Sequence, residues 1–473
     1  MFFQQFYLKS LGHASYLIAD DSSGRALIWD PRRDVDDYVD AARMHGLRIA
    51  YAADSHGHND YLTGLSEIPT RAPGVQLLGS AAGELRYAHR PVKDGEIVEL
   101  GDQVAVQVLH TPGHTPEHIS LLVYDRGTGK EPAMMLSGGS LLVGDLARPD
   151  LLGGSKQARE AARAFCHTLR TKVLPLPDHV QVFPTHVAGS LCGGNIGSRL
   201  STTIGYERRT NATLSAVSDS ERFVAATLRP KTLPAVPPYW RRMRSRNLAG
   251  PDSLGLLPEP APLYPDEFLR ASGGDRAVVL DTRSAEAFGG GHIPGALGVG
   301  LGSSFPTWAG TLLPEDAQVL LVLDDPADLW KATWELLRIG YDIPAGWLAG
   351  GMMAWRTAGQ PVEHLPQITA AELHDELQSG SMRVLDVRQP AEWNAGHISD
   401  AIHITGAELP ERAGELHNGW GGDAQERPLA VVCGSGYRST AAASLLASRG
   451  DGPVYNVLGG MSAWNELDYP TTS

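Results

Sequence analysis

The sequence contains few cysteines and no secretion signal. Only three cysteines, Cys166, Cys192 and Cys433, occur in 473 residues, so a disulfide framework is excluded and a reducing compartment is indicated. The amino-terminal stretch MFFQQFYLKS lacks the basic start, the apolar run and the small-residue cleavage site of an exported protein. We therefore expect a cytoplasmic protein.

Basic charge and long apolar runs are also scarce. Forty Lys and Arg residues stand against 54 Asp and Glu, a net charge of −14 that argues against nucleic acid as a partner. The run VLLVL has the length of a strand and falls far short of the roughly 18 apolar residues that span a membrane. With 42% hydrophobic and 20% charged residues, the chain has the composition of a folded globular protein. Its length suggests about three domains at roughly 150 residues each.

Proline marks one boundary. The stretch 229–265 is crowded with proline, which fixes φ and removes backbone donors, so we expect an extended connector there. It contains one short basic stretch, YWRRMRSRN, with helical character. Its arginines either face solvent, clasp a neighbouring domain or bind the anionic tail of a substrate.

The sequence beyond the connector repeats itself. VVLDTRSAEAFGGGHIPGAL matches RVLDVRQPAEWNAGHISDAI at an offset of about 105 residues, and LAGGMMAWRTAG matches VLGGMSAWNELD at about 109. Each copy alternates strands and helices over about 100 residues, which predicts a small α/β domain with a mostly parallel sheet. We therefore predict domains at 1–228, 266–366 and 367–473.

The strongest motif is the loop VVCGSGYRST in the second copy. A strand delivers Cys433, Gly434 and Gly436 make a tight turn, and Arg438 and Ser439 open a helix. Inward-pointing N–H groups, the helix N-terminus and the arginine all favour a thiolate or a bound sulfane sulfur. A structural cysteine at a strand end is the alternative, and it leaves the glycines and the Arg-Ser pair unexplained.

This loop resembles the C-x-x-G-x-R-S loop of the rhodanese (sulfurtransferase) family, and DVRQPAEWNAGHI resembles that family's D-x-R-x-x-x-E-[WFY]-x-x-G-H-I. The resemblance implies an active sulfurtransferase domain over 367–473, with Cys433 as the catalytic thiol. In the first copy, alignment through Gly-Gly-Met places Asp324 at the position of Cys433. Because a carboxylate cannot carry a persulfide, we expect 266–366 to be a catalytically inactive copy that serves packing, spacing or dimerisation.

The first 228 residues present histidines at strand ends. ADSHGHNDYLTG supplies His56, His58 and Asp60, HTPGHTPEHI supplies His114 on a glycine turn, and FPTH supplies His186. Three separated sites of this kind indicate a metal centre at the edge of an α/β/β/α sandwich.

The whole set resembles the metallo-β-lactamase fold family, with its T-H-x-H-x-D-H and T-P-G-H-T motifs. Tyr61 replaces the last histidine of the first motif, which disfavours a two-zinc hydrolase of the glyoxalase II or lactamase type. The resemblance to the branch of the persulfide dioxygenases implies one Fe(II). Its ligands would be His56, His114 and the Asp of an S-G-D segment, with open positions for substrate and O₂.

That aspartate is missing. MLSGGSLLVGDLARPDLLG follows the branch pattern, but Gly139 stands at the ligand position, and Asp145 aligns with a different, structural aspartate. Three states are left open: weak iron binding through His56 and His114 with help from His58, a three-histidine site for another divalent metal such as zinc, or an empty site.

The other two cysteines have separate interpretations. Cys192 follows His186 in a turn of Gly and Ser, and it is either a thiol that relays sulfur near the metal or a packed small side chain. Cys166, in AARAFCHTL, is assigned to the core. The glycine run 289–291 has no strand–GxGxxG–helix context, so no nucleotide site is predicted.

The domain order resembles the persulfide dioxygenase–rhodanese fusion family over essentially the whole chain. That resemblance implies that a low-molecular-weight persulfide is oxidised by O₂ to sulfite at the iron, and that Cys433 moves sulfane sulfur between persulfide and sulfite or thiosulfate. We also expect a homo-oligomer. The alternatives are a sulfurtransferase whose first domain is a scaffold, a thioester or lactone hydrolase, and a non-enzymatic sulfur carrier.

Overall fold

The chain forms two compact units. The computed structural model describes residues 1–228, 233–418 and 427–473. Unit 1 comprises Met1–Leu233 and Trp240–Leu256, and unit 2 comprises Pro234–Tyr239 and Leu257–Ser473. The basic stretch in the proline-rich segment forms helix α6 (Trp240–Ala249), as expected, and this helix belongs to unit 1.

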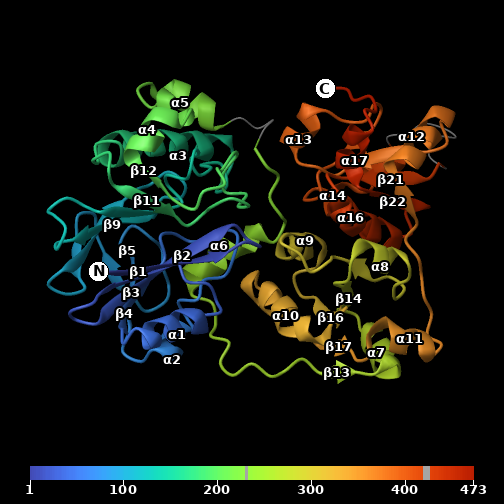
Figure 1. Ribbon diagram of the computed structural model, residues 1–473, viewed down its shortest axis with the longest axis horizontal. Helices are drawn as coiled ribbons and strands as arrows, with labels where there is room; N and C mark the ends of the chain where they lie inside the picture. Colours follow the sequence, from blue (N-terminus) through green and yellow to red (C-terminus); the bar gives the residue numbers. More distant parts are fainter. Residues whose placement is uncertain (229–232, 419–426) are drawn as a thin grey trace. The chain divides into compact units, whose positions relative to one another are not determined.

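Unit 1 contains two six-stranded sheets, ordered β1-β2-β3-β4-β5-β6 and β12-β11-β10-β9-β8-β7 (Figure 1). The strands of the first sheet are β1 (Phe2–Leu8), β2 (His13–Asp20), β3 (Arg25–Trp29), β4 (Arg48–Ala53), β5 (Gln76–Ser80) and β6 (Arg90–Val92). Those of the second are β7 (Ile97–Glu99), β8 (Val104–His110), β9 (Ile119–Asp125), β10 (Met134–Gly138), β11 (Gln181–Pro184) and β12 (Thr202–Thr203).

Three apolar layers hold unit 1 together. Between the sheets, side chains such as Tyr16 and Trp29 are fully buried, each contributing about 1.5–3 kcal/mol or more of transfer free energy. Helices α1 (Asp36–Met44) and α2 (Ile68–Arg71) cover the first sheet, and helices on the far side cover the second. This arrangement confirms the predicted α/β/β/α sandwich.

The helices on the second sheet are amphipathic. In α3 (Ser155–Thr168), the buried residues Ala158, Ala162 and Phe165 recur at helical spacing, which gives the helix one apolar face. It is followed by η1 (Leu169–Val173), α4 (Ile204–Thr210), η2 (Thr213–Ala216) and α5 (Ser220–Thr227). Within the described residues, no helix of either unit has the length and apolar character needed to cross a bilayer.

Unit 2 contains two five-stranded sheets with the same connectivity. They are ordered β13-β17-β16-β14-β15 and β18-β22-β21-β19-β20, and the neighbouring strands run parallel. The first repeat has β13 (Pro262–Leu263), β14 (Ala277–Asp281), β15 (Leu297–Gly298), β16 (Gln318–Val322) and β17 (Gly346–Leu348). The second has β18 (Gln367–Thr369), β19 (Arg383–Asp386), β20 (Ile402–His403), β21 (Leu429–Val432) and β22 (Val454–Leu458). Two α/β domains with parallel sheets were predicted from the repeat, and this fold class is confirmed.

Along the chain, the helices of unit 2 alternate with these strands (Figure 1). The first repeat has α7 (Pro265–Ser272), α8 (Ala285–Gly289), α9 (Phe305–Leu312), η3 (Pro326–Asp328), α10 (Leu329–Arg338) and α11 (Gly351–Thr357). The second has α12 (Ala370–Ser379), α13 (Pro390–Ala395), α14 (Leu409–Arg412), α15 (Glu415–Asn418), α16 (Tyr437–Ser448) and α17 (Gly460–Glu466).

Each repeat carries the same buried ion pair at the end of its second strand in chain order, β14 or β19. Asp281 and Arg283 in the first repeat, and Asp386 and Arg388 in the second, approach to 2.6 Å. Each arginine also donates to a backbone oxygen eight residues further on, at 2.9 and 2.8 Å. Because the buried charges are paired and hydrogen-bonded, they hold the turn after the strand in one conformation.

Candidate active sites

The thiol of Cys433 lies in a cradle of hydrogen-bond donors. Cys433 directly follows β21 and is fully buried. The backbone N–H of Gly436 donates to its Sγ at 3.2 Å, and the Ser439 hydroxyl lies 3.4 Å from the same atom. Gly436 caps α16 with φ of +101°, a conformation that favours glycine. The helix N-terminus therefore points at the sulfur and favours negative charge there.

Arg438 stands beside this cradle in a bidentate ion pair. Its two terminal nitrogens each donate to a carboxylate oxygen of Glu392, from α13, at 2.7 Å. Burial alone raises the pKa of Glu392, but the bond to Arg438 outweighs burial and holds that pKa below its ordinary value. The pair places a fixed cation near the thiol.

A polar side chain that the sequence analysis missed supports the loop from the neighbouring strand. Asn456, in β22, accepts a 2.6 Å hydrogen bond from the Ser439 hydroxyl and so orients that hydroxyl beside Cys433. The backbone oxygen of Cys433 also accepts from Met461 N–H at 2.8 Å. A buried asparagine in the otherwise apolar strand VYNVL is the signal that could have found it.

The first repeat has no thiol at this place, and the strand register corrects which residue stands there. Asp281 pairs with Val322, as Asp386 pairs with Val432, so Leu323 and not Asp324 is the counterpart of Cys433. The error came from aligning through the later Gly-Gly-Met. The helix ends agree with the corrected offset, since α10 ends at Arg338 and α16 at Ser448, and the one-residue difference lies after them. Leu323 is buried, whereas Asp324 is exposed.

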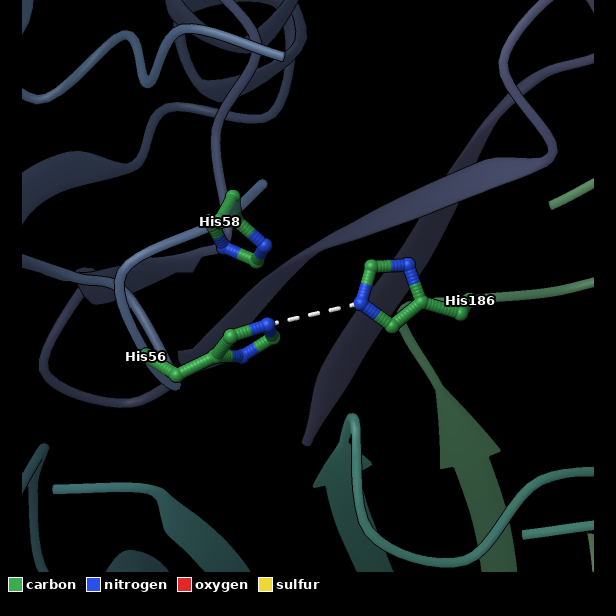
Figure 2. A group of neighbouring side chains, drawn as sticks. All are labelled: His56, His58 and His186. Atoms are coloured by element: carbon green, nitrogen blue, oxygen red, sulfur yellow. Dashed lines mark hydrogen bonds between the residues drawn. The ribbon is translucent and has the colours of Figure 1, made fainter. Parts of the chain in front are cut away.

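In unit 1, the histidines predicted from separate motifs lie together. His56 and His58 come from the loop after β4, and His186 comes from the end of β11 (Figure 2). The Nε2 atoms of His56 and His186 face each other at 3.4 Å. His114, from the turn after β8, has its ring centroid 4.8 Å from that of His56.

Neighbouring groups fix the orientation of these rings. His56 Nδ1 lies 2.8 Å from the Ser55 hydroxyl, and His186 Nδ1 lies 3.3 Å from the Asp60 carboxylate. His114 Nδ1 donates to the backbone oxygen of Arg148 at 2.8 Å. The Nε2 atom of His114 is buried and has no hydrogen-bond partner among the described residues. Such outer partners are typical of metal-binding histidines.

Burial and nearby charges shift the pKa values of the histidines in different directions. Burial, with help from neighbouring imidazoles, lowers the pKa of His56 well below its ordinary value and lowers that of His114 to about 3. Burial also opposes protonation of His58, but the Asp30 carboxylate 3.1 Å from its Nε2 outweighs burial and raises the pKa of His58. His56 and His114 are therefore neutral, as metal ligands must be.

His118 is a further member of the cluster that the sequence analysis missed. Its Nε2 accepts from the backbone N–H of Gly139 at 2.8 Å, and its Nδ1 lies 2.8 Å from the Thr111 hydroxyl. Both ring nitrogens are thus engaged, so His118 positions the loop rather than offering a ligand. It follows His114 by four residues in TPGHTPEHI, where its place beside the metal motif was the available signal.

Helix α6 closes unit 1 beside this cluster. Arg244 donates to Glu117 at 2.6 Å, and Glu117 in turn accepts from Gly57 N–H at 3.0 Å, so the basic helix clasps its own unit. A pocket at this place is lined by Asn59, Glu84, Leu85, Arg86, Leu151, Leu152, Trp240, Arg241, Arg244, Ser245 and Leu248. Since Asn59 adjoins His58 in the chain, the pocket lies next to the histidine loop.

Comparison with known proteins identifies both halves. A model of the rhodanese-like domain matches residues 264–358 and 369–467. The crystal structure of a metallo-β-lactamase from Staphylococcus aureus subsp. aureus COL is 32% identical, covering 73% of this chain and 98% of that one with a TM-score of 0.65. The chain belongs to the metallo-β-lactamase–rhodanese fusions. The predicted resemblance is thereby confirmed.

Curated relatives of this fusion protein match its N-terminal part. Persulfide dioxygenase ETHE1, mitochondrial, from Bos taurus is 28% identical over 189 residues, 39% of this chain. Hydroxyacylglutathione hydrolase cytoplasmic from Arabidopsis thaliana is 30% identical over 172 residues, 36% of this chain. The chain spans 66% and 62% of the length of these two relatives. Together with the rhodanese-like domains, the relatives support an enzyme of sulfur metabolism.

The residues of the fusion protein do not provide a two-histidine, one-carboxylate iron site. Gly139 lies against His114 and His56 but has no side chain to offer. Asp145 accepts from the backbone N–H groups of Gly194 and Asn195, both at 2.7 Å, and so shapes a loop instead. Tyr61 is buried, with its hydroxyl 3.4 Å from the Asp30 backbone oxygen. The carboxylates that touch the cluster are already paired, Asp60 with His186 and Asp30 with His58.

The two remaining cysteines differ in surroundings. Cys166 packs in the core of α3 and donates to the Val217 backbone oxygen at 3.3 Å, and burial raises the pKa of its thiol. Cys192 is fully buried next to the histidines. One nitrogen of His114, one nitrogen of His186 and the Sγ of Cys192 all lie within 4.8 Å of one another.

Proposed function

We propose that this protein is a sulfurtransferase of persulfide metabolism in which Cys433 carries the sulfur. The observation that carries the proposal is the Cys433 thiol, held within 3.2 Å of a backbone N–H and 3.4 Å of a hydroxyl at a helix N-terminus. Substrates would be a low-molecular-weight persulfide or thiosulfate as donor, with sulfite, cyanide or a thiol as acceptor.

The first half-reaction loads the enzyme. The Cys433 thiolate attacks the outer sulfur of the donor, the donor's S–S bond breaks, and sulfite or a thiolate leaves with the bonding electron pair. The thiol proton passes to solvent or to the leaving thiolate. The product is a Cys433 persulfide whose terminal sulfur lies over the Gly436 N–H and the α16 N-terminus, which stabilise its negative charge.

The second half-reaction returns the thiolate. An acceptor nucleophile attacks the terminal sulfur of the persulfide, the enzyme's S–S bond breaks, and Cys433 regains the electron pair. Arg438 stays ion-paired with Glu392, so its guanidinium keeps a fixed position beside the thiol. No oxidant is consumed in either half-reaction.

The experiment combines kinetics with mass spectrometry. The full chain, incubated with thiosulfate, should gain the mass of one sulfur atom at Cys433 and lose it on addition of cyanide with release of thiocyanate. A chain that turns over thiosulfate and cyanide without a sulfur adduct on the Cys433 peptide would contradict the proposal.

Oxidation of a persulfide to sulfite in unit 1 is the second candidate function. The persulfide dioxygenase among the curated relatives favours it, as do the buried, neutral imidazoles of His56 and His114. Gly139, however, leaves the carboxylate position of such an iron site without a ligand. Iron content and O₂ uptake with glutathione persulfide decide between this candidate and a unit 1 without oxygenase activity.

Gly139→Asp is the direct test of that candidate. Restoring the carboxylate should raise both the iron content and the rate of O₂ uptake. A Cβ at residue 139 would fall 2.6 Å from His114 Cδ2, so the His114 ring must shift to admit it. Gly139→Ala introduces the same Cβ without a ligand and serves as the control. Equal iron in the wild type and both variants, by elemental analysis, would rule the idea out.

A further inference from the structure

At residue 139 of unit 1, the position of the missing carboxylate, there is no side chain and little room for one. A Cβ built on Gly139 meets His114 Cδ2 at 2.6 Å and His56 Cε1 at 3.1 Å. A side chain at residue 139 would therefore require the His114 ring to shift, and in this chain none is present. A metal at this place must therefore take its remaining ligand from another direction.

Cys192 approaches the cluster from such a direction. Its side chain is fully buried, and its Sγ lies within 4.8 Å of ring nitrogens of both His114 and His186. Two ligands of one zinc ion, each about 2.0–2.3 Å from it, stand roughly 3–4.5 Å apart. The three atoms therefore lie at separations that one ion can bridge with little movement.

Backbone hydrogen bonds of Arg148 hold the Cys192 segment and the His114 ring in fixed positions relative to each other. Arg148 N–H donates to the Cys192 backbone oxygen at 2.8 Å, while the Arg148 oxygen accepts from His114 Nδ1 at 2.8 Å. One residue therefore fixes both groups. The Asp145 carboxylate caps the next turn through Gly194 and Asn195, both at 2.7 Å. The loop that presents Cys192 is thus positioned without help from an ion.

The imidazoles offer their lone pairs to the same space. His114 Nδ1 donates to a carbonyl, so its Nε2 is the unprotonated nitrogen, and that atom is buried without a hydrogen-bond partner in the described part of the chain. His56 and His186 hold their Nδ1 atoms against Ser55 and Asp60. Their Nε2 atoms stand 3.4 Å apart, close to the roughly 3.3 Å between two nitrogens of a tetrahedral zinc site.

We infer that unit 1 binds one divalent metal ion through His114, His186 and the thiolate of Cys192, with His56 beside them. The thiolate takes the place of the carboxylate missing at Gly139. A set of two imidazoles and one thiolate favours zinc over the Fe(II) of a two-histidine, one-carboxylate site. Binding forms a metal–sulfur bond and releases the thiol proton to solvent. This inference is independent of sulfur transfer at Cys433.

Cobalt(II) is the probe, because a thiolate ligand gives Co(II) a charge-transfer band in the near ultraviolet and tetrahedral geometry gives intense visible bands. The full chain is stripped with a chelator and titrated with Co(II) under anaerobic conditions. The wild type should bind one equivalent with both sets of bands. Absence of the charge-transfer band, or purification with stoichiometric iron and no zinc, would overturn the inference.

Variants assign the sulfur. Cys192→Ser should lose the charge-transfer band and bind the metal more than about 100-fold more weakly, beyond the usual effect of losing an outer partner. Cys166→Ser and Cys433→Ser, the same change at the other two cysteines, should keep the band. A band that persists in Cys192→Ser would overturn the inference.

A second substitution guards against a folding defect. Cys192→Asp replaces the thiolate with another anionic ligand, so it should still bind one equivalent of Co(II) while losing the charge-transfer band. Thiosulfate:cyanide transfer is measured on every preparation. A wild type without transfer activity would contradict the proposed function but would leave the inference about the metal site unaffected. Equal bands in Cys192→Asp and the wild type would show that the sulfur ligand is not Cys192.

Discussion

The two repeats of unit 2 share one framework and differ in one loop. Both sheets have the same strand order, and strands β14 and β19 both end in a buried Asp–Arg pair at 2.6 Å. The loops that follow β16 in the first repeat and β21 in the second differ in every residue that lies against the Cys433 thiol or its counterpart. The comparison separates the residues that make the fold from the residues that make the chemistry.

The loop of the first repeat lacks the donor as well as the thiol. With Leu323 opposite Cys433, the same offset places Pro326 opposite Gly436, whose N–H donates to the sulfur. Proline has no N–H to donate. A cysteine at 323 alone would therefore face a loop without its main donor, and Asp325 instead caps the short helix η3.

The largest expected effect comes from removing the thiol that distinguishes the repeats. Cys433→Ser should lower thiosulfate:cyanide transfer by at least about 10³-fold, because the nucleophile is lost while the loop is kept. Cys166→Ser, the same change in the core of unit 1, should leave transfer unchanged. Transfer that survives in Cys433→Ser would remove the assignment of the second repeat as the catalytic one.

The next effect comes from giving the second repeat the proline of the first. Gly436→Pro removes the N–H that donates to Cys433 Sγ and cannot adopt the φ of +101° seen there. We expect kcat/KM for thiosulfate to fall by about 10²–10³-fold, the usual cost of losing one donor to a reacting anion.

Gly436→Ala is the matched control for that change. Alanine keeps the N–H but shares the strain of a positive φ, and its Cβ would lie 3.3 Å from the Val457 oxygen. Its kcat/KM should therefore fall less. Equal losses in Gly436→Pro and Gly436→Ala would show that backbone strain, and not the donor, separates the repeats.

A smaller effect concerns the Arg438–Glu392 pair, which the second repeat places beside its thiol. Arg438 holds the pKa of Glu392 below its ordinary value of 4.5, so the pair's contribution to stability is present above that pH and is lost as the pH falls below it. Urea unfolding, followed by circular dichroism at pH values from about 6 down to about 3, should show this decline in the wild type. Glu392→Gln should flatten it, and an unchanged pH profile in that variant would contradict the assignment.

Much of this organisation was predictable from residue patterns. Repetition of LDTR as LDVR revealed the two domains of unit 2, and the loop around Cys433 revealed the thiol site, because glycines and Arg-Ser at fixed spacing have few other uses. The histidines of unit 1 were predicted as a cluster from three separate motifs. In each case a local pattern sufficed, since the chemistry requires particular residues at particular spacings.

Other features depended on contacts across the fold. The counterpart of Cys433 was misassigned by one residue, because the length difference between the repeats lies after helices α10 and α16 and only the strand pairing reveals it. Asn456 and Cys192 gain their significance from the neighbours that folding brings to them, Ser439 in one case and His114 and His186 in the other. No spacing in the sequence encodes those distances.

The smallest expected effect tests whether the first repeat supports the second. The Tyr437 hydroxyl, next to the catalytic turn, donates to the Gly300 backbone oxygen of the first repeat at 2.6 Å. Tyr437→Phe removes one partly buried hydrogen bond and should destabilise unit 2 by about 0.5–1.5 kcal/mol, which lowers its Tm by roughly 1–6 °C. Tyr455→Phe, on a strand of the second repeat and packed against its core, is the control and should shift Tm less. If both variants melt together with the wild type in calorimetry, the first repeat does not stabilise the second through this contact, and the shared framework would reflect duplication alone.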